Sequence, residues 1–530
     1  MSQDVFARDW DVIVVGTGMG GGPLGRRLAE KGWSVLFVER GPLGHPAAQH
    51  DLNYEMADPV ARHVRGYWPT PVRATVNNET FEFFAPLGSG VGGSSTFYAG
   101  ALERPEPHDL DDSIERPHPT GGWPVSFAQM QPWLAEAEAM FMVNGTQDPL
   151  GDGQERLLAP NAPRTDEAAL IAGMQANGLH PYQGHLAFRR DPSCPICTSG
   201  GRCPKHPKMD GRTAGVDPAL ETGHAALLTN ATVRRLKGHS GRVSEVEIET
   251  NKGTQTLKSR IVVLAAGALS SPGILLNSAS EEWPDGCANS SGLVGKNLMF
   301  HMNEMFALWP PKSARTEGPT KAIAMRDLYY KDGQRLGLVQ AMGIEAKYGE
   351  IVHFLNLAYD RSFLRRFRLL KQFTRIPALI AAKLFGSAAV FVGILEDLPY
   401  KENRVIADRE NPDQLAFEYT ISPELLMRRK TFRTEIKRAL RGMRMVFLNR
   451  GPELNYGHAC GTLKFGSNPA ESVLDEACKA HDLDNLYVAD SSFMPTSFGT
   501  NPSLTIAANA LRVADHVHGA LLKEKDLGHD

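Results

Sequence analysis

Three glycines near the amino terminus, Gly16, Gly18 and Gly21, have the spacing of a phosphate-binding turn. An apolar run of β-formers at residues 12–15 precedes them, and a helical pattern and a second apolar run follow before Glu39. In such a βαβ unit the backbone N–H groups of the turn approach a pyrophosphate at a helix N-terminus. The acid after the second strand can accept hydrogen bonds from an adenosine ribose. This stretch therefore predicts a dinucleotide site.

A second glycine-rich stretch, residues 88–100, contains Gly88, Gly90, Gly92, Gly93 and Gly100. Each glycine loses much backbone entropy on ordering, so a plain strand or helix is disfavoured here. Two interpretations stay open: a flexible loop, or backbone that lies flat against a large planar ligand.

Three cysteines, Cys194, Cys197 and Cys203, form a C-x2-C-x5-C pattern, and His206 follows. Thiolates at this density could ligate an iron–sulfur cluster or, together with the imidazole, a zinc ion. The spacing fits no standard metal site well, so a loop without metal is the alternative.

The composition is that of a large globular protein. A chain of 530 residues can bury a sizeable core and should form more than one domain. Its 60 acidic and 57 basic residues nearly balance, which argues against nucleic acid as a partner. The first residues have no apolar signal core, and six cysteines are too few for a disulfide scaffold, so a cytoplasmic protein is expected.

The elements that must position these residues follow from periodicity. Alternating apolar segments at residues 304–309, 336–342 and 390–395 predict an antiparallel sheet. Ser422 is placed to cap a helix that begins at Pro423. Residues 42–80 are irregular and predict a surface loop or lid. Further predictions are helices at 127–140, 423–448 and 502–517, a helix beginning at 270, and a strand at 486–490.

Residues 363–385 combine a helical pattern with apolar and basic side chains, and Pro377 is expected to kink or split the helix. Such a helix could lie on an anionic membrane or contact another subunit. It could also pack its apolar face inward and leave the basic face in solvent. A peripheral membrane location is therefore an alternative to a purely cytoplasmic one.

Five different motifs follow one another along nearly the whole chain, in the order that one enzyme family shows. They are residues 14–39, 88–96, 263–272, 293–301, and a C-terminal set that runs from 458–462 through 485–492 to 499–505. In this the chain resembles the glucose–methanol–choline (GMC) flavin oxidoreductases. Its motifs are most similar to those of pyranose oxidase-like and sugar or gluconate dehydrogenase-like members.

The resemblance implies an α/β fold with two domains. One is a Rossmann-like FAD-binding domain of the glutathione-reductase type, which we assign to residues 1–110, 215–302 and 451–530. The other is an α+β substrate domain built on an antiparallel sheet. We assign to it residues 111–214 and 303–450, including a lid and the cysteine loop.

The resemblance also implies FAD and the residues that hold it. Asp490 would hold the flavin side through the ribityl chain, and backbone near Val233 would meet the adenine. Phe97 stands where pyranose oxidases place a histidine bonded to FAD, so we expect non-covalent FAD. The cofactor-binding residues expected are Gly16, Gly18, Met19, Gly21, Glu39, Arg40, Gly88, Gly92, Gly93, Ser94, Val233, Ala266, Gly267, Asp490, Asn501 and Pro502.

The expected chemistry is removal of a hydroxyl proton and of a hydride from the same carbon. A neutral imidazole can take the proton, a contribution of roughly 10²–10⁴-fold. His458 matches the family's catalytic histidine, and Asn501 matches the second position, where an amide can donate to the same oxygen. A rival interpretation is that Asn501 caps the last helix, because Pro502 follows it.

The sequence thus predicts an FAD-dependent enzyme that oxidises CH–OH to a carbonyl, on a sugar, glycoside or polyol. The alternatives are a bulky hydrophobic alcohol reached at a membrane surface, and a lyase or decarboxylase of the same fold. The electron acceptor could be oxygen, a quinone or a redox protein.

Overall fold

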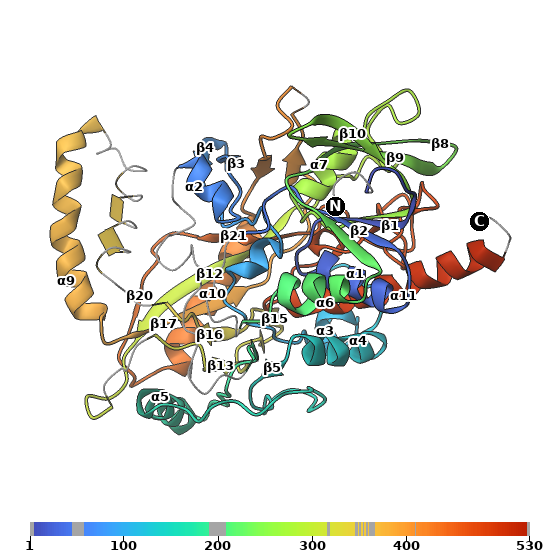
Figure 1. The fold of residues 1–530 in the computed structure, drawn as a ribbon. Helices are drawn as coiled ribbons and strands as arrows, with labels where there is room; N and C mark the ends of the chain where they lie inside the picture. Colours follow the sequence, from blue (N-terminus) through green and yellow to red (C-terminus); the bar gives the residue numbers. More distant parts are fainter. Residues whose placement is uncertain are drawn as a thin grey trace.

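The computed structural model describes residues 5–44, 58–189, 208–314, 319–344, 366–408 and 410–526, with a few positions between 348 and 359. The α/β architecture expected from the sequence is present: one parallel sheet, several antiparallel sheets, and helices around them (Figure 1). No helix among the described residues is long and apolar enough to cross a bilayer.

A five-stranded sheet of order β22-β11-β1-β2-β7 stands at the centre of the first part of the fold, and all its neighbouring strands are parallel. Strands β1, β2 and β22 are buried along nearly their whole length, as expected for a parallel sheet covered on both faces. Helices α1, α11 and α4 lie on one side of this sheet and the β8–β10 sheet on the other (Figure 1). The strands are β1 (Trp10–Val15), β2 (Val35–Val38), β7 (Ala225–Leu228), β11 (Ser259–Leu264) and β22 (Leu486–Val488).

The second large sheet has the order β13-β16-β17-β12-β20, with β21 also paired to β12. Every one of these pairings is antiparallel, which confirms the prediction from the alternating segments. Helix α10 packs on this sheet through Phe432 and Ile436, whose side chains lie against Gly393. The strands are β12 (Met299–Leu308), β13 (Ala324–Met325), β16 (Val339–Ala341), β17 (Ala389–Leu395), β20 (Met445–Phe447) and β21 (Leu454–Cys460).

Several predicted helices are confirmed, and two bounds were wrong. Helix α4 spans Phe127–Met140 as predicted, and Ser422 caps α10 by accepting a hydrogen bond from the Leu425 N–H. Helix α10 (Pro423–Ala439) is shorter than predicted, because the chain turns at Gly442 (φ +83°) and continues into β20. Helix α11 (Ser503–Asp526) runs well past residue 517.

The prediction of an irregular loop at residues 42–80 was wrong for about half of its described part. Asp58 caps the short helix α2 (Pro59–Val64), and β3 (Val72–Val76) joins a four-stranded sheet of order β18-β19-β3-β4. The strand was hidden because its partner β19 lies far along the chain. That pairing joins part of the predicted FAD-binding segment to the predicted substrate segment, and the domain division stays a prediction.

The prediction that Pro377 kinks or splits the helix at residues 363–385 is confirmed in its second form, because two separate helices meet just before this proline. A 3-10 helix η4 (Arg368–Thr374) is followed by α9 (Arg375–Phe385), and Pro377 lies in the first turn of α9, where a missing N–H costs nothing.

The remaining elements are α1 (Gly21–Glu30), β4 (Glu79–Phe83), η1 (Gly93–Thr96), α3 (Pro107–Leu110), β5 (Val143–Asn144), α5 (Thr165–Ala176), β6 (Leu186–Ala187), η2 (Gly211–Val216), α6 (Asp217–Glu221), β8 (Thr232–His239), β9 (Arg242–Thr250), β10 (Gly253–Leu257), α7 (Ser270–Asn277), β14 (Tyr330–Lys331), β15 (Gln334–Arg335), β18 (Arg404–Ile406), β19 (Ala416–Tyr419) and η5 (Ser491–Phe493).

Candidate active site

A cavity of about 520 Å³ lies at the carboxyl ends of β1, β2, β11 and β22. This is the edge of a parallel sheet where ligands bind in open α/β folds, and the volume is typical of a ligand site. The cavity extends to the second sheet, because Met342, Asn455 and His458 also line it.

Most of the predicted cofactor-binding residues line this cavity. Gly21 and Gly92 do not: Gly21 packs against the backbone of Gly16, and the Gly92 N–H donates to the Thr17 hydroxyl at 3.1 Å. The predicted residues that line it are Gly16, Gly18, Met19, Glu39, Arg40, Gly88, Gly93, Ser94, Val233, Ala266, Gly267, Asp490, Asn501 and Pro502.

The turn after β1 has the geometry that a pyrophosphate site requires. Gly16 has φ +99°, and a Cβ atom on it would lie 2.4 Å from the Ala265 carbonyl oxygen, so only glycine fits. Helix α1 begins directly after this turn, and the residues that lead into it, Gly18, Met19 and Gly20, line the cavity. The cradle therefore fits the dinucleotide part of FAD.

Thr17 connects three parts of this cradle, a role that the sequence reasoning missed. Its hydroxyl donates to Glu39 Oε2 at 2.6 Å and accepts from the Gly92 N–H. Glu39 Oε1 accepts from the Gly41 N–H at 3.0 Å, and burial raises the pKa of this carboxyl. The only sequence signal was a hydroxyl residue between two glycines of the motif.

At the end of the cavity next to Glu39, Arg40 lies over the ring of Trp68 at 4.0 Å and forms an ion pair with Asp413 at 3.0 Å. Val233, on β8, is buried at the same end of the cavity. Burial lowers the pKa of Arg40, with the neighbouring Asp413 opposing that shift.

Asp490 follows β22 and accepts several hydrogen bonds on the side of the cavity formed by the ends of β11 and β22. Its Oδ2 accepts from the Gly267 N–H at 2.8 Å, and its Oδ1 accepts from the Ser492 N–H at 2.9 Å. It also accepts from the Ser271 hydroxyl at the start of α7. The carboxylate thus holds the turn after β11 in place beside the cavity.

His458, on β21, is partly exposed to the cavity, and a second imidazole holds it. His301, on β12, is fully buried, and its Nδ1 lies 3.0 Å from His458 Nδ1. His301 Nε2 lies 2.8 Å from the Phe498 carbonyl oxygen and 3.1 Å from that of Ser497. Sequence reasoning included His301 in a family motif but assigned it no role.

These distances fix which nitrogens carry protons. A nitrogen between two carbonyl oxygens must be a donor, so His301 Nε2 is protonated and, in the neutral ring, His301 Nδ1 is an acceptor. His458 Nδ1 must then donate to it, which leaves His458 Nε2 without a proton. The arrangement presents a neutral imidazole with a free basic nitrogen.

Both imidazoles stay neutral at physiological pH. Burial, with His301 and Lys321 close by, holds the pKa of His458 well below its usual value. Burial lowers the pKa of His301 to about 4, although the two carbonyl contacts oppose the shift. A base that is already neutral needs no deprotonation before it can act.

Asn501 lines the same cavity just before α11. Its Oδ1 is buried and accepts no hydrogen bond from any described residue, so the structure does not show it capping that helix. The segment that carries it is the one whose carbonyls at 497 and 498 contact His301. Hydrogen bonds therefore connect His458 to His301 and His301 to the backbone a few residues before Asn501.

The predicted metal ligands Cys194, Cys197 and Cys203 lie outside the described residues. Within the described part of the chain, no group of three or more His, Cys, Asp or Glu side chains could hold a metal ion.

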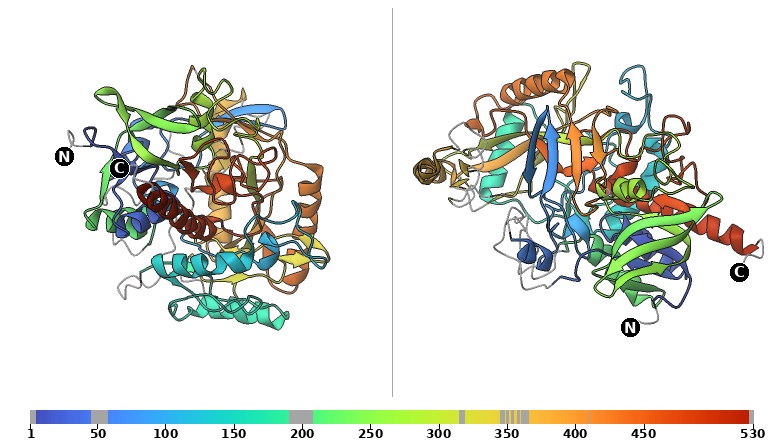
Figure 2. Two further views of the ribbon diagram at one scale, coloured as in Figure 1. Left: turned by 90° about the vertical axis from the view of Figure 1, so that its right-hand side faces the viewer. Right: turned by 90° about the horizontal axis from the view of Figure 1, so that it is seen from above.

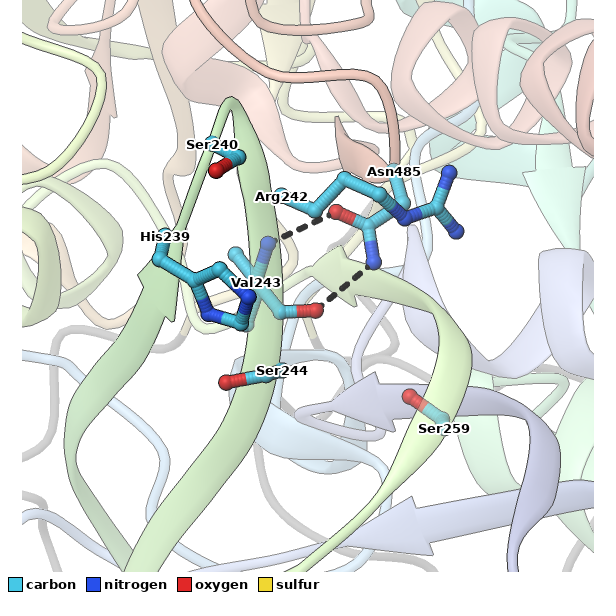
Figure 3. A pocket seen from close by; sticks show the side chains of 7 residues that line it. All are labelled: His239, Ser240, Arg242, Val243, Ser244, Ser259 and Asn485. Atoms are coloured by element: carbon cyan, nitrogen blue, oxygen red, sulfur yellow. Dashed lines mark hydrogen bonds between the residues drawn. The ribbon is translucent and has the colours of Figure 1, made fainter.

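Another cavity, of about 300 Å³, lies at the β8–β9 hairpin (Figure 3). In it Asn485 donates to the Val243 carbonyl oxygen at 2.9 Å and accepts from the Val243 N–H at 2.8 Å. This pair fastens β9 to the chain before β22. None of the predicted site residues lies there.

The family models of GMC oxidoreductases match two long stretches of this chain. The N-terminal model matches residues 33–303 and the C-terminal model matches residues 399–510. The chain is a GMC oxidoreductase. It is accordingly an enzyme that binds FAD and oxidises an alcohol group.

Relatives of this GMC oxidoreductase extend over nearly the whole chain. It is 29% identical to paromamine 6'-oxidase of Streptomyces fradiae, over 97% of this chain and 92% of the relative. It is 28% identical to 6'''-hydroxyparomomycin C oxidase of Streptomyces lividus, over 98% and 93% of the two chains. Among solved structures, pyridoxine 4-oxidase from Mesorbium loti aligns with a TM-score of 0.63 at 20% identity, covering 96% of this chain and 99% of that one, which shows the shared fold.

Proposed function

We propose that this oxidoreductase converts a CH–OH group of a sugar, glycoside or polyol into a carbonyl, with His458 as the base. The observation that supports this most is the unprotonated Nε2 of His458 in a cavity that also contains the glycine turns. An alcohol is too weak an acid to lose its proton unaided at neutral pH, so a neutral imidazole within reach is the group that the reaction needs.

The cofactor would be held along the length of the cavity. The turn at Gly16 and Gly18, with Glu39, would hold the pyrophosphate and adenosine, and Asp490, Asn501 and Pro502 would border the flavin. When bound, FAD supplies the acceptor for the hydride that leaves the substrate carbon.

The side chains of this chain handle the proton. His458 Nε2 takes the hydroxyl proton as the hydride leaves, and the oxygen–hydrogen bond electrons become the second bond of the carbonyl. The resulting imidazolium keeps its Nδ1–H directed at His301, which disperses the charge. The amide of Asn501 would donate to the substrate oxygen and fix its approach to His458.

The substrate class is supported by the relatives. Two of them are named as oxidases of paromamine and of 6'''-hydroxyparomomycin C, which are aminoglycosides. A hydroxylated ring substrate of this kind would present several polar groups to the cavity, and Asn455 and Asn501 line it.

A second candidate is a bulky apolar alcohol. Met342 and Ile344 line the cavity, and Ile344 is 39% exposed. Such side chains would favour an apolar substrate over a polyol.

The decisive experiment is anaerobic reduction of the bound flavin by a panel of sugars, polyols, aliphatic alcohols and aromatic alcohols. Bleaching by sugars or polyols is the expected result. Bleaching only by apolar alcohols would select the second candidate. If no alcohol bleaches the flavin, a lyase or decarboxylase reaction replaces both. Reoxidation with oxygen, a quinone or a redox protein then identifies the electron acceptor.

A further inference from the structure

The excursion between β16 and β17, residues 342–388, carries an apolar surface that faces outward. Seven large apolar side chains in its described part are each between 45% and 61% exposed. They are Phe367, Leu370, Phe373, Ile376, Leu379, Ile380 and Leu384, which we call the outer face of η4–α9. Isolated exposed apolar residues are ordinary, but a contiguous set of this size marks a contact surface.

An ordinary surface helix buries its apolar face against the protein, whereas α9 exposes its apolar face to solvent. Ala378 is the only fully buried residue of α9, while Ile376, Ile380 and Leu384 recur at helical spacing on the exposed side. Near its C-terminus the helix is attached to the body: Trp309 donates to the Leu384 carbonyl oxygen at 3.2 Å, and the Phe385 and Trp309 rings lie 5.6 Å apart. Figures 1 and 2 show α9 standing apart from the rest of the fold.

The sequence of η4–α9 and its immediate flanks carries charge of one sign. Between Asp360 and Glu396 the sequence contains seven basic residues and no acidic one. Arg366, just before η4, and Arg375, the first residue of α9, are exposed, and Lys383 lies beside Leu384. The basic residues are Arg361, Arg365, Arg366, Arg368, Lys371, Arg375 and Lys383.

We infer that the outer face of η4–α9 docks on the surface of an anionic lipid bilayer. Apolar side chains flanked by arginine and lysine suit the boundary between lipid headgroups and acyl chains. An 11-residue helix is about 16 Å long, about half the hydrocarbon thickness, so α9 lies in the interface and does not span it.

A second copy of this chain is a poorer occupant. In a two-fold contact through this face, Arg366 and Arg375 of each copy would approach the same residues of the other, and like charges would repel. An anionic lipid surface neutralises that charge instead.

The segment that carries this face also contributes to the cavity. Met342 and Ile344, which line the cavity, stand at the start of the same excursion. The surface and the cavity thus belong to one segment of chain, and docking does not depend on which alcohol is oxidised.

The test is flotation of the FAD-loaded protein with vesicles of phosphatidylcholine alone or mixed with phosphatidylglycerol. We expect binding to the anionic vesicles, weakened by 1 M salt. The triple variant I376S/I380S/L384S should bind at least about a hundredfold more weakly, and R366E/R375E more than about tenfold. The matched control I114S/M427S replaces exposed apolar residues elsewhere, which are 95% and 61% exposed, and should bind normally.

Flavin absorbance and turnover of a soluble substrate should be unchanged in all these variants, which separates docking from folding and from the proposed reaction. Failure to bind anionic vesicles, or equal binding by the triple variant, would overturn the inference. Light scattering supplies a further check. If the triple variant turns an oligomer into a monomer, the face is a subunit interface and the bilayer is excluded.

Discussion

His301 contacts one member of the proposed catalytic pair, His458, and the chain segment that leads to the other, Asn501. Its Nδ1 faces His458, and its Nε2 faces the carbonyl three residues before Asn501. A single buried ring can therefore set the tautomer of the base and the position of the segment that carries the amide. We propose it as a positioning residue that touches no substrate.

Replacing the base should remove most of the activity. His458→Asn is expected to lower kcat/KM by about 10²–10⁴-fold, or about 3–5 kcal/mol, because the substrate proton then has no acceptor. Anaerobic stopped-flow reduction of the flavin measures the loss. The control is H239N, which changes a histidine in the remote cavity. An active H458N enzyme with normal flavin reduction would refute the mechanism.

Replacing the positioning residue should act through His458. His301→Leu leaves the His458 Nδ1–H without its acceptor, and we expect flavin reduction to slow by about 10–100-fold. His301→Gln should restore part of the rate, since an amide can donate to Phe498 and accept from His458. The acid limb of the pH profile should also move in H301L. A merely structural effect would leave that limb in place and would not be rescued.

The pH dependence follows from the lowered pKa of His458. The active form is the neutral imidazole, and protonation abolishes it, so activity is lost only as pH falls through this depressed pKa. We expect kcat/KM to stay level from pH 8 through pH 6.5 and to decline well below that. Half-loss at pH 7 or above would mean that the base titrates at or above its ordinary value.

At the scale of elements, Thr17 joins the turn after β1, the acid after β2 and the second glycine stretch. Thr17→Val would leave Glu39 and the Gly92 N–H without this partner. A lost buried hydrogen bond of this kind costs about 1–3 kcal/mol, so FAD affinity should fall by about 10–100-fold. Titration of apoprotein with FAD measures it.

Two further variants complete this test. Thr17→Ser keeps the hydroxyl and should bind FAD normally. Thr75→Val, which removes an exposed hydroxyl on β3, is the matched control. Equal affinity in T17V and the wild type would show that the shared hydroxyl contributes nothing to the cradle.

Elements whose signals are local could be predicted from the sequence. The β1–α1–β2 unit and α4, with its Ser126 cap, depend on neighbouring residues, and both were found. Strand β3 was missed because its partner β19 is remote, and the end of α10 was misplaced because one glycine turn decides it.

The site residues likewise divide into those that could be predicted from local motifs and those that could not. The glycine turns and His458 lie in recognisable motifs. The role of His301 could not be predicted, because it depends on the three-dimensional meeting of β12, β21 and the chain at 497–498. Local sequence patterns do not show which distant segments of the chain lie together, and these roles depend on such contacts.

At the scale of the whole molecule, the cavity proposed to hold the cofactor is lined by segments from most of the chain. Phe97 lines the cavity, and its ring lies 4.6 Å from that of Tyr67, so this position offers no nucleophile for a bond to the flavin. We expect acid precipitation to leave a colourless pellet and a yellow supernatant. A pellet that stays yellow would show a covalent flavin.

The central sheet also has a consequence for how the protein is made. Its edge strand β22 begins at Leu486, and Asp490, Asn501 and α11 come later still. A nascent chain on the ribosome therefore lacks one wall of the cavity until the segment from β22 to the start of α11 has been made. Cofactor capture must follow synthesis of that segment, and a chain cut short before Leu486 would yield a colourless, unstable product.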